Sequence, residues 1–106
     1  MAWLILLLAG AVEIVMALSL KAADGWSRPL PGAIGIVAAL ASIFLLTHAM
    51  KALPAGTAYA VWTGIGAVGV TLLGMVMHGD SASPVRLLCV GLVVAGVIGL
   101  RLVEQA

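Results

Sequence analysis

One acidic residue interrupts the first long apolar run of this chain. Glu13 lies between Trp3 and Leu20, and no other charged side chain occurs in that stretch. An acidic side chain near the middle of a bilayer costs about 2.5–3.5 kcal/mol on insertion scales, so such a residue is by default a functional candidate. Because removal from water disfavours the charged form of a carboxyl group, we expect Glu13 to hold a proton unless a cation takes the proton's place. Competition between a proton and a cation for one carboxylate is the minimum requirement for an antiporter.

Side chains suited to a small organic cation recur at helical spacing, both around Glu13 and in two later apolar runs. Residues three or four positions apart share one face of a helix. The candidate pocket residues are Gly10 and Met16 beside Glu13, Ala39 and Ser42 in the second run, and Tyr59, Trp62 and Thr63 in the third. A carboxylate surrounded by aromatic faces and hydrogen-bonding groups is a suitable site for a flat organic cation.

Two structural roles for Glu13 are alternatives to cation exchange. The first is a carboxyl group hydrogen-bonded between helices, but no Lys, Arg or His lies inside an apolar core to pair with it. The second is a ring-forming, proteolipid-like subunit that uses Glu13 for proton passage or assembly. Ring proteolipids pack through dense glycine repeats in their inner helix, whereas the first run here contains only Gly10. Both observations favour cation exchange.

Four long apolar runs must position these residues. Apolar residues make up 64% of the 106-residue chain and charged residues 8%, against about 45–50% and about 25% in soluble domains, which excludes a water-soluble fold. Roughly 20 mostly apolar residues cross a bilayer as a helix. Runs of that length occur at 3–20, 30–50, 56–77 and 84–103. The chain is therefore predicted to be an all-α integral membrane protein, with a single four-helix transmembrane domain over residues 1–106.

The basic residues give almost no preference for one orientation in the membrane. Lys51 and Arg101 fall on one side of the predicted spans, and Lys21, Arg28 and Arg86 fall on the other. Such a split hardly biases topology under the positive-inside rule. An antiparallel, dual-topology homodimer is therefore available to this chain, although a fixed topology with a weak bias is the alternative.

Small residues mark two helices for close packing. In the fourth run Gly91, Ala95 and Gly99 form a ridge at i, i+4 and i+8, which lets a partner backbone approach closely in lipid. This ridge is a candidate dimer interface, with packing inside one subunit as the equal alternative. In the third run Gly64 and Gly66 permit either a helix bend or a close contact.

Several function classes are not expected from this sequence. A net charge of +1 is too small for nucleic-acid binding. No P-loop, no GxSxG motif and no zinc-ligand spacing is present, so we expect no enzyme activity, no cofactor and no metal. His48 and His78 lie at probable water interfaces, and we interpret both as solvated side chains. The expected partners are a small organic cation, protons, lipid and a second copy of the chain.

The motifs as a whole resemble one transporter family. They comprise Glu13 in the first run, Leu20-Lys21 and Gly25-x-x-Arg28 after it, and Pro54-x-Gly56-x-Ala58-Tyr59-Ala60-x-Trp62-x-Gly64-x-Gly66 in the third. In this order, with a glycine-rich fourth run, they resemble the small multidrug resistance family over essentially the whole chain. The segment from Ala60 to Gly66, together with Ser42, is more similar to the guanidinium-exporter subtype than to the quaternary-ammonium subtype.

This resemblance implies a fold, a location and a set of roles. It implies an antiparallel homodimer of four-helix subunits in a bacterial inner membrane, which exports its substrate in exchange for protons. By the same resemblance Glu13 is the shared proton and cation site, Ser42 and Trp62 hydrogen-bond around it, and Tyr59 closes the pocket. The resemblance also assigns a helix bend to Gly64 and Gly66, and dimerisation to the ridge of the fourth run.

Two positions depart from the guanidinium-exporter pattern. Met16 stands where that subtype usually has Trp, and Ala39 stands where a bulkier residue is expected. Methionine donates no hydrogen bond but fills irregular space, and alanine leaves a gap, so both changes predict a roomier pocket. We therefore expect export of guanidinium and of larger guanidinyl cations such as guanylurea and substituted guanidines. Export of quaternary ammonium or aromatic cations is the nearest alternative.

Overall fold

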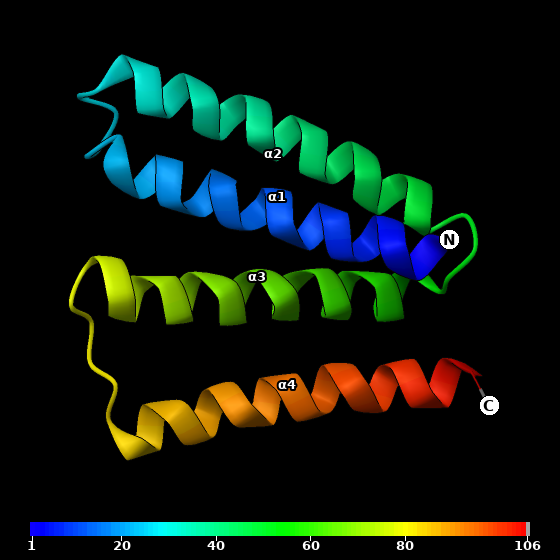
Figure 1. Ribbon diagram of the computed structural model, residues 1–106. Helices are drawn as coiled ribbons and strands as arrows, with labels where there is room; N and C mark the ends of the chain where they lie inside the picture. The colour runs from blue at the N-terminus through cyan, green and yellow to red at the C-terminus, as the bar shows by residue number, and fades with distance from the viewer. Residues whose placement is uncertain (106) are drawn as a thin grey trace.

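Four helices make up the protein. The computed structural model describes the backbone of residues 1–105 and the side chains of residues 1–104. The helices are α1 (Ala2–Ala22), α2 (Pro29–Ala49), α3 (Ala55–Met77) and α4 (Pro84–Gln105) (Figure 1). Each is long and apolar enough to cross a membrane. The prediction of an all-α chain with four membrane-spanning helices is therefore confirmed.

Prolines and turn residues fix where the helices begin and end. Pro29 and Pro84 begin α2 and α4, and Pro54 is the residue just before α3. A proline there is tolerated because the first backbone N–H groups of a helix have no partner within the helix. Between α1 and α2 the chain reverses through Asp24, Gly25 and Trp26, whose φ angles are 48°, 67° and 74°. The reversals are short, so helices that follow one another in sequence run antiparallel.

The helices lie side by side in one layer rather than closing into a bundle. Their order across the layer is α2, α1, α3, α4 (Figure 1). The Cα atoms span 46 × 35 × 17 Å, so the short dimension is less than half of either other dimension. Helices α1 and α3 are the two inner helices of this layer, and Glu13 on α1 lies between α2 and α3.

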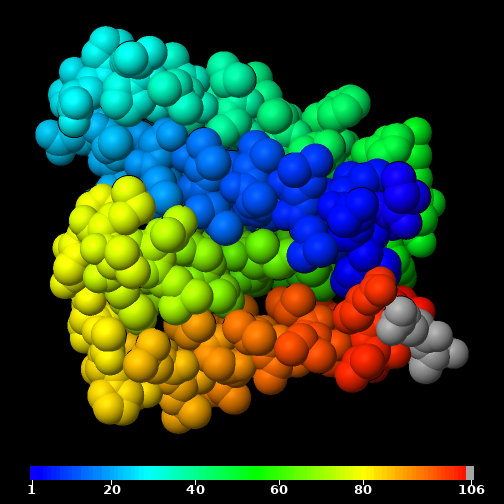
Figure 2. Space-filling view, in the orientation of Figure 1, coloured from blue at the N-terminus to red at the C-terminus, as the bar shows by residue number. Residues whose placement is uncertain are grey.

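The small core is formed by the first three helices. Leu6, Leu46, Ala49, Ala58 and Val61 form one buried cluster at the end where α1, α2 and α3 meet. In contrast, no residue of α4 with a described side chain is buried. Figure 2 shows α4, coloured orange to red, along the outer edge of the layer. In lipid such exposed apolar faces carry little penalty, because the acyl chains are as apolar as the side chains.

Candidate functional site

The carboxyl group of Glu13 lies against the backbone of α3. A Cβ atom built on Gly66 would stand 2.5 Å from Glu13 Cδ and closer still to Oε1. Only a residue without a side chain fits there while the carboxyl group keeps this position. Glu13 Oε1 is buried and has no hydrogen-bond partner among the described residues. The acceptor is therefore removed from water and available to a proton or to a donor from a ligand.

A chain of hydrogen bonds joins three helices one turn away from Glu13. Trp62 Nε1 of α3 donates to Ser42 Oγ of α2 at 2.8 Å. Ser42, which is completely buried, donates in turn to the backbone carbonyl of Ala9 in α1 at 2.6 Å. In a regular α-helix the carbonyl of residue 9 is the acceptor for the backbone N–H of residue 13. These hydrogen bonds therefore fix the position of the helical turn that carries Glu13.

Ser42 and Trp62 were expected to hydrogen-bond around Glu13, and that role stays a prediction. They bond to each other and to the α1 backbone, while Glu13 Oε1 accepts no hydrogen bond from either. Sequence reasoning did not identify the Ala9 carbonyl as part of this network. No sequence signal marks it, because every residue type carries the same backbone carbonyl.

The aromatic part of the candidate pocket opens away from the single chain. The ring centroids of Tyr59 and Trp62 are 5.6 Å apart with an interplanar angle of 52°. Tyr59 is 57% exposed and Thr63 is also exposed, whereas Trp62 is half-buried. Since positions 59, 62, 63 and 66 share one helical face, that face runs from the carboxyl group of Glu13 to an open aromatic pair.

The other predicted pocket residues occupy two environments. Gly10 is buried, and the side chain of Ile65 fills the space that a larger residue would need, at 2.8 Å from a built Cβ. Met16 and Ala39 are half-buried. The structure thus brings Glu13, Ser42 and Trp62 into one region. It leaves the faces of Tyr59 and Thr63 uncovered.

Gly64 and Gly66 contact different neighbours. A Cβ on Gly64 would stand 2.7 Å from Val97 Cγ2 of α4, whereas Gly66 faces Glu13 of α1. Both glycines lie inside one uninterrupted helix from Ala55 to Met77. Two residues along a helix correspond to a rotation of about 200°, so these glycines allow close approach on opposite sides of α3. Their role in a helix bend stays a prediction.

The ridge of α4 does not pack within the subunit. A Cβ built on Gly91 or Gly99 would have nothing within 4 Å, and Ala95 is exposed. Among the described residues, no close packing of this ridge within the subunit is therefore seen at Gly91 or Gly99. Its role as a dimer interface stays a prediction.

Two open grooves run between α1 and α4 over α3. The larger has a volume of about 530 Å³ and the smaller about 320 Å³, and neither includes Glu13, Ser42 or Trp62. No group of three or more His, Cys, Asp or Glu side chains that could hold a metal ion occurs among the described residues. The region around Glu13 is therefore a buried contact rather than part of either groove.

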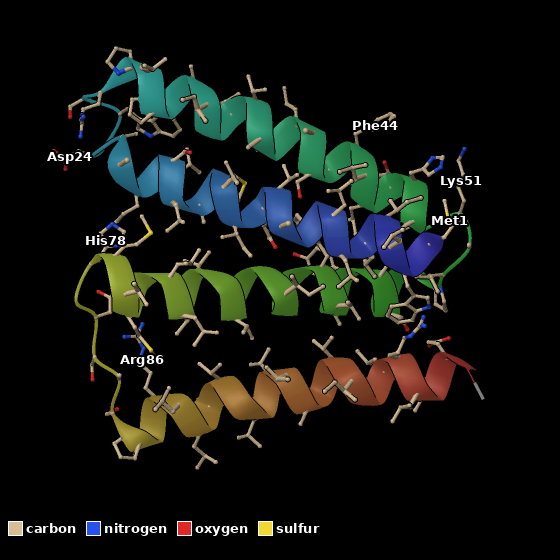
Figure 3. The ribbon with its side chains drawn as sticks, viewed as in Figure 1. Met1, Asp24, Phe44, Lys51, His78 and Arg86 are labelled. Carbon is tan, nitrogen blue, oxygen red and sulfur yellow. The ribbon has the colours of Figure 1, made fainter. Side chains whose placement is uncertain are left out.

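Polar side chains gather at the two ends of the layer. Figure 3 shows Asp24, His78 and Arg86 at one end and Lys51 at the other. His48 and His78 are both exposed. This arrangement leaves the central part of the helices to apolar side chains and to the region around Glu13.

The sequence is similar to a family of small transporters. A family model described as Small Multidrug Resistance protein matches residues 1–93. A guanidinium exporter from Yersinia pseudotuberculosis is 59% identical over 102 residues, which cover 96% of this chain and 98% of the relative. Guanidinium exporters from Salmonella typhimurium and Citrobacter freundii are 57% and 55% identical over 102 residues, which cover 96% of this chain and 97% of each relative. The family match includes α1, α2 and α3 and therefore all the candidate pocket residues.

Proposed function

The chain belongs to the small multidrug resistance family, and we propose that it exports guanidinium and larger guanidinyl cations in exchange for protons. It is a multi-pass protein of the bacterial inner membrane. Relatives that are 55–59% identical over nearly their whole length are named guanidinium exporters, which supports this substrate class. Those names describe transport rather than the catalysis of a reaction.

The observation that carries the proposal is the buried, unpartnered acceptor of Glu13. Oε1 lies at the contact between α1 and α3 with no donor among the described residues. A guanidinium ion is planar and presents paired N–H groups in the geometry that a carboxylate accepts. A proton bound to the carboxyl group removes the charge that holds the cation. Proton and substrate therefore exclude each other at Glu13, and this exclusion couples export to proton entry.

A second subunit in antiparallel orientation completes the pocket in this proposal. The exposed pair of Tyr59 and Thr63 lies on the same helical face as Gly66, so a partner that covers this face closes the pocket over Glu13. The uncovered ridge of α4 supplies a separate surface for the same association, because small residues allow close backbone approach in lipid. The nearly even division of basic residues permits the two subunits to insert in opposite orientations.

Pocket size sets the substrate range. Met16 and Ala39 are half-buried, and neither donates a side-chain hydrogen bond. Because methionine is flexible and alanine is small, we expect the pocket to admit guanylurea and substituted guanidines in addition to guanidinium. The tilted aromatic pair of Tyr59 and Trp62 also suits quaternary ammonium ions, which bind to ring faces, so these ions form the second candidate class.

Substrate-evoked current separates these candidates. Purified protein is reconstituted into vesicles on supported-membrane electrodes and exposed to guanidinium, guanylurea or tetrapropylammonium. We expect both guanidinyl compounds to evoke currents in the wild-type protein, and neither compound to evoke a current in Glu13→Gln. Asp24→Asn is the matched control, because it removes an exposed loop carboxylate and because asparagine tolerates the positive φ of that position.

Each other outcome has a definite meaning. Currents from tetrapropylammonium alone would replace the guanidinyl class with the quaternary ammonium class. Currents that persist in Glu13→Gln would contradict a role for this carboxyl group in coupling. Silence with all three compounds, from protein that remains folded and dimeric, would favour a structural role for the chain.

A further inference from the structure

The two grooves between α1 and α4 form one continuous furrow with a single basic residue at its end. They share Ile65, Val97 and Ile98, so the larger groove leads directly into the smaller. Arg101 lines the outer end of the larger groove. The smaller groove is lined only by glycine and aliphatic residues and reaches Ile14 on α1. The furrow therefore has a cationic end and an apolar length.

The guanidinium of Arg101 contacts an aromatic ring and has no ion-pair partner among the residues with described side chains. Its Cζ atom lies 4.8 Å from the centre of the Trp3 ring. Glu104, one turn along α4, instead accepts a hydrogen bond of 2.7 Å from Thr57 Oγ1. Among the described residues the ion pair present is that of Arg86 and Asp80, and Arg101 takes part in none. The indole therefore orients its N–H groups, and no carboxylate among the described side chains accepts from them.

The dimensions of the furrow match one leaflet of a bilayer. From Met1 to Ile14 the α1 wall rises about 20 Å at roughly 1.5 Å per residue. The hydrocarbon layer is about 30 Å thick, so this wall covers at least one leaflet. Figure 2 shows the first turns of α1, in dark blue, meeting the last turns of α4, in red, at this end of the layer. Arg101 thus lies where a lipid headgroup begins, and the furrow follows the direction of the acyl chain.

We propose that this furrow binds one anionic phospholipid, with the phosphate at Arg101 and one acyl chain along Leu4, Leu7, Ile65 and Ile98. Charge complementarity selects this occupant, because an apolar groove that ends in a guanidinium group fits an amphiphile with an anionic head. A zwitterionic lipid fills the same groove but gains less from Arg101. The site is separate from Glu13, so the proposal does not depend on the substrate of the transporter.

The ridge on α4 leaves this furrow open. At 100° per residue, the ridge of Gly91, Ala95 and Gly99 points about 110° away from the side of α4 that lines the furrow at 94, 97, 98 and 101. A second subunit seated on the ridge therefore covers a different face of α4. Lipid in the furrow and a partner on the ridge occupy α4 at the same time.

Native mass spectrometry of the full chain tests this site. Protein in detergent is mixed with phosphatidylglycerol or phosphatidylcholine carrying identical acyl chains, and the fraction that retains lipid is measured. We expect preferential retention of phosphatidylglycerol, reduced about fivefold in Arg101→Gln, the factor that one basic residue contributes at an anionic lipid surface. Arg86→Gln is the control, because it removes one positive charge from the other end of the protein. Ile98→Trp should also lower retention, because it fills the furrow and leaves every charge in place.

Four results would overturn the proposal. The first is equal retention of the two lipids by the wild-type chain. The second is an equal loss in Arg101→Gln and Arg86→Gln, which would indicate general surface charge. The third is full retention of phosphatidylglycerol by Ile98→Trp, which would exclude an acyl chain in the furrow. The fourth is dissociation of the dimer by Ile98→Trp without loss of lipid, which would assign the furrow to a second copy of the chain.

Discussion

The first three helices and the fourth helix are held by different kinds of contact. Helices α1, α2 and α3 share a buried cluster and a hydrogen-bond chain through Ser42. Helix α4 has no buried residue with a described side chain. Its polar links to the other helices lie near its C-terminal end, where Arg101 stacks on Trp3 and Glu104 accepts from Thr57. Buried polar groups with few partners require defined positions, whereas apolar ridges in lipid can pack in several arrangements. This difference supports the proposal that the first region binds the substrate and the second takes part in assembly.

Substitutions of Gly64 and Gly66 allow the two regions to be compared within one helix, α3. We expect Gly66→Ala to lower guanidinium transport by up to about a hundredfold, because the added methyl group displaces the carboxyl group of Glu13 and misplacement by about 1 Å can have that effect. Gly64→Ala meets the methyl groups of Val97 and Val93 on the loosely packed α4, and we expect a change of less than about threefold. Equal transport rates in the two variants, measured in vesicles at matched protein content, would contradict this assignment.

Two side-chain hydrogen bonds that involve α3 allow the same comparison, one between Trp62 and Ser42 and one between Thr57 and Glu104. Ser42→Ala leaves Trp62 Nε1 without its acceptor and removes the side-chain hydrogen bond to the Ala9 carbonyl, which keeps its helical bond. A buried unsatisfied donor costs about 1–3 kcal/mol. We expect transport to fall about tenfold. Thr57→Ala removes a bond to the exposed Glu104, which water can replace, and we expect less than about a twofold change. Transport by Ser42→Ala at the wild-type rate would show that the chain of bonds does not position Glu13.

A substitution on the ridge of α4 can disrupt the proposed dimer interface without changing the pocket. Gly91→Leu places a large side chain in the proposed interface, and we expect cross-linking in vesicles to show a several-fold loss of dimer. Gly96→Leu is the matched control, because Gly96 also has nothing within 4 Å of a built Cβ but lies off the ridge. Equal dimer fractions in the two variants would exclude the ridge as the interface.

A substitution at Met16 tests the prediction that this position sets the size of the substrate. Met16→Trp should narrow the pocket and lower the ratio of guanylurea to guanidinium transport, by a factor of roughly ten, within the range that hydrophobic pockets achieve by size. The two substrates are compared at equal concentration in the same vesicle preparation. Equal guanidinium export by both proteins, with guanylurea exported by neither, would contradict a pocket enlarged at this position.

The fold class was predictable because it depends on properties local to the sequence. Hydropathy identifies spans, and the prolines at 29, 54 and 84 mark helix starts, since neither signal requires knowledge of a neighbouring helix. The resemblance to the family was equally accessible and is confirmed by the match over residues 1–93.

The arrangement of the site was less predictable because it depends on how the helices rotate against one another. The glycine spacing suggested either a bend or close packing, but only the rotation of α1 against α3 brings Gly66 to Glu13. The hydroxyl of Ser42 was identified, yet its acceptor is the backbone carbonyl of Ala9 rather than a side chain. Composition and periodicity carry no information on such a choice of acceptor.

We propose that protons and guanidinium compete for Glu13, and guanidinium binding measured against pH distinguishes competition from independent binding. We predict that the apparent Kd of the reconstituted wild-type protein increases as the pH falls, by up to about tenfold per pH unit in the range where the carboxyl group takes up its proton. Protonation removes the charge that holds the cation, so affinity is lost on the acidic side and retained on the alkaline side. Glu13→Gln should bind no guanidinium at any pH. A Kd that does not change with pH, or binding that persists in Glu13→Gln, would contradict the account.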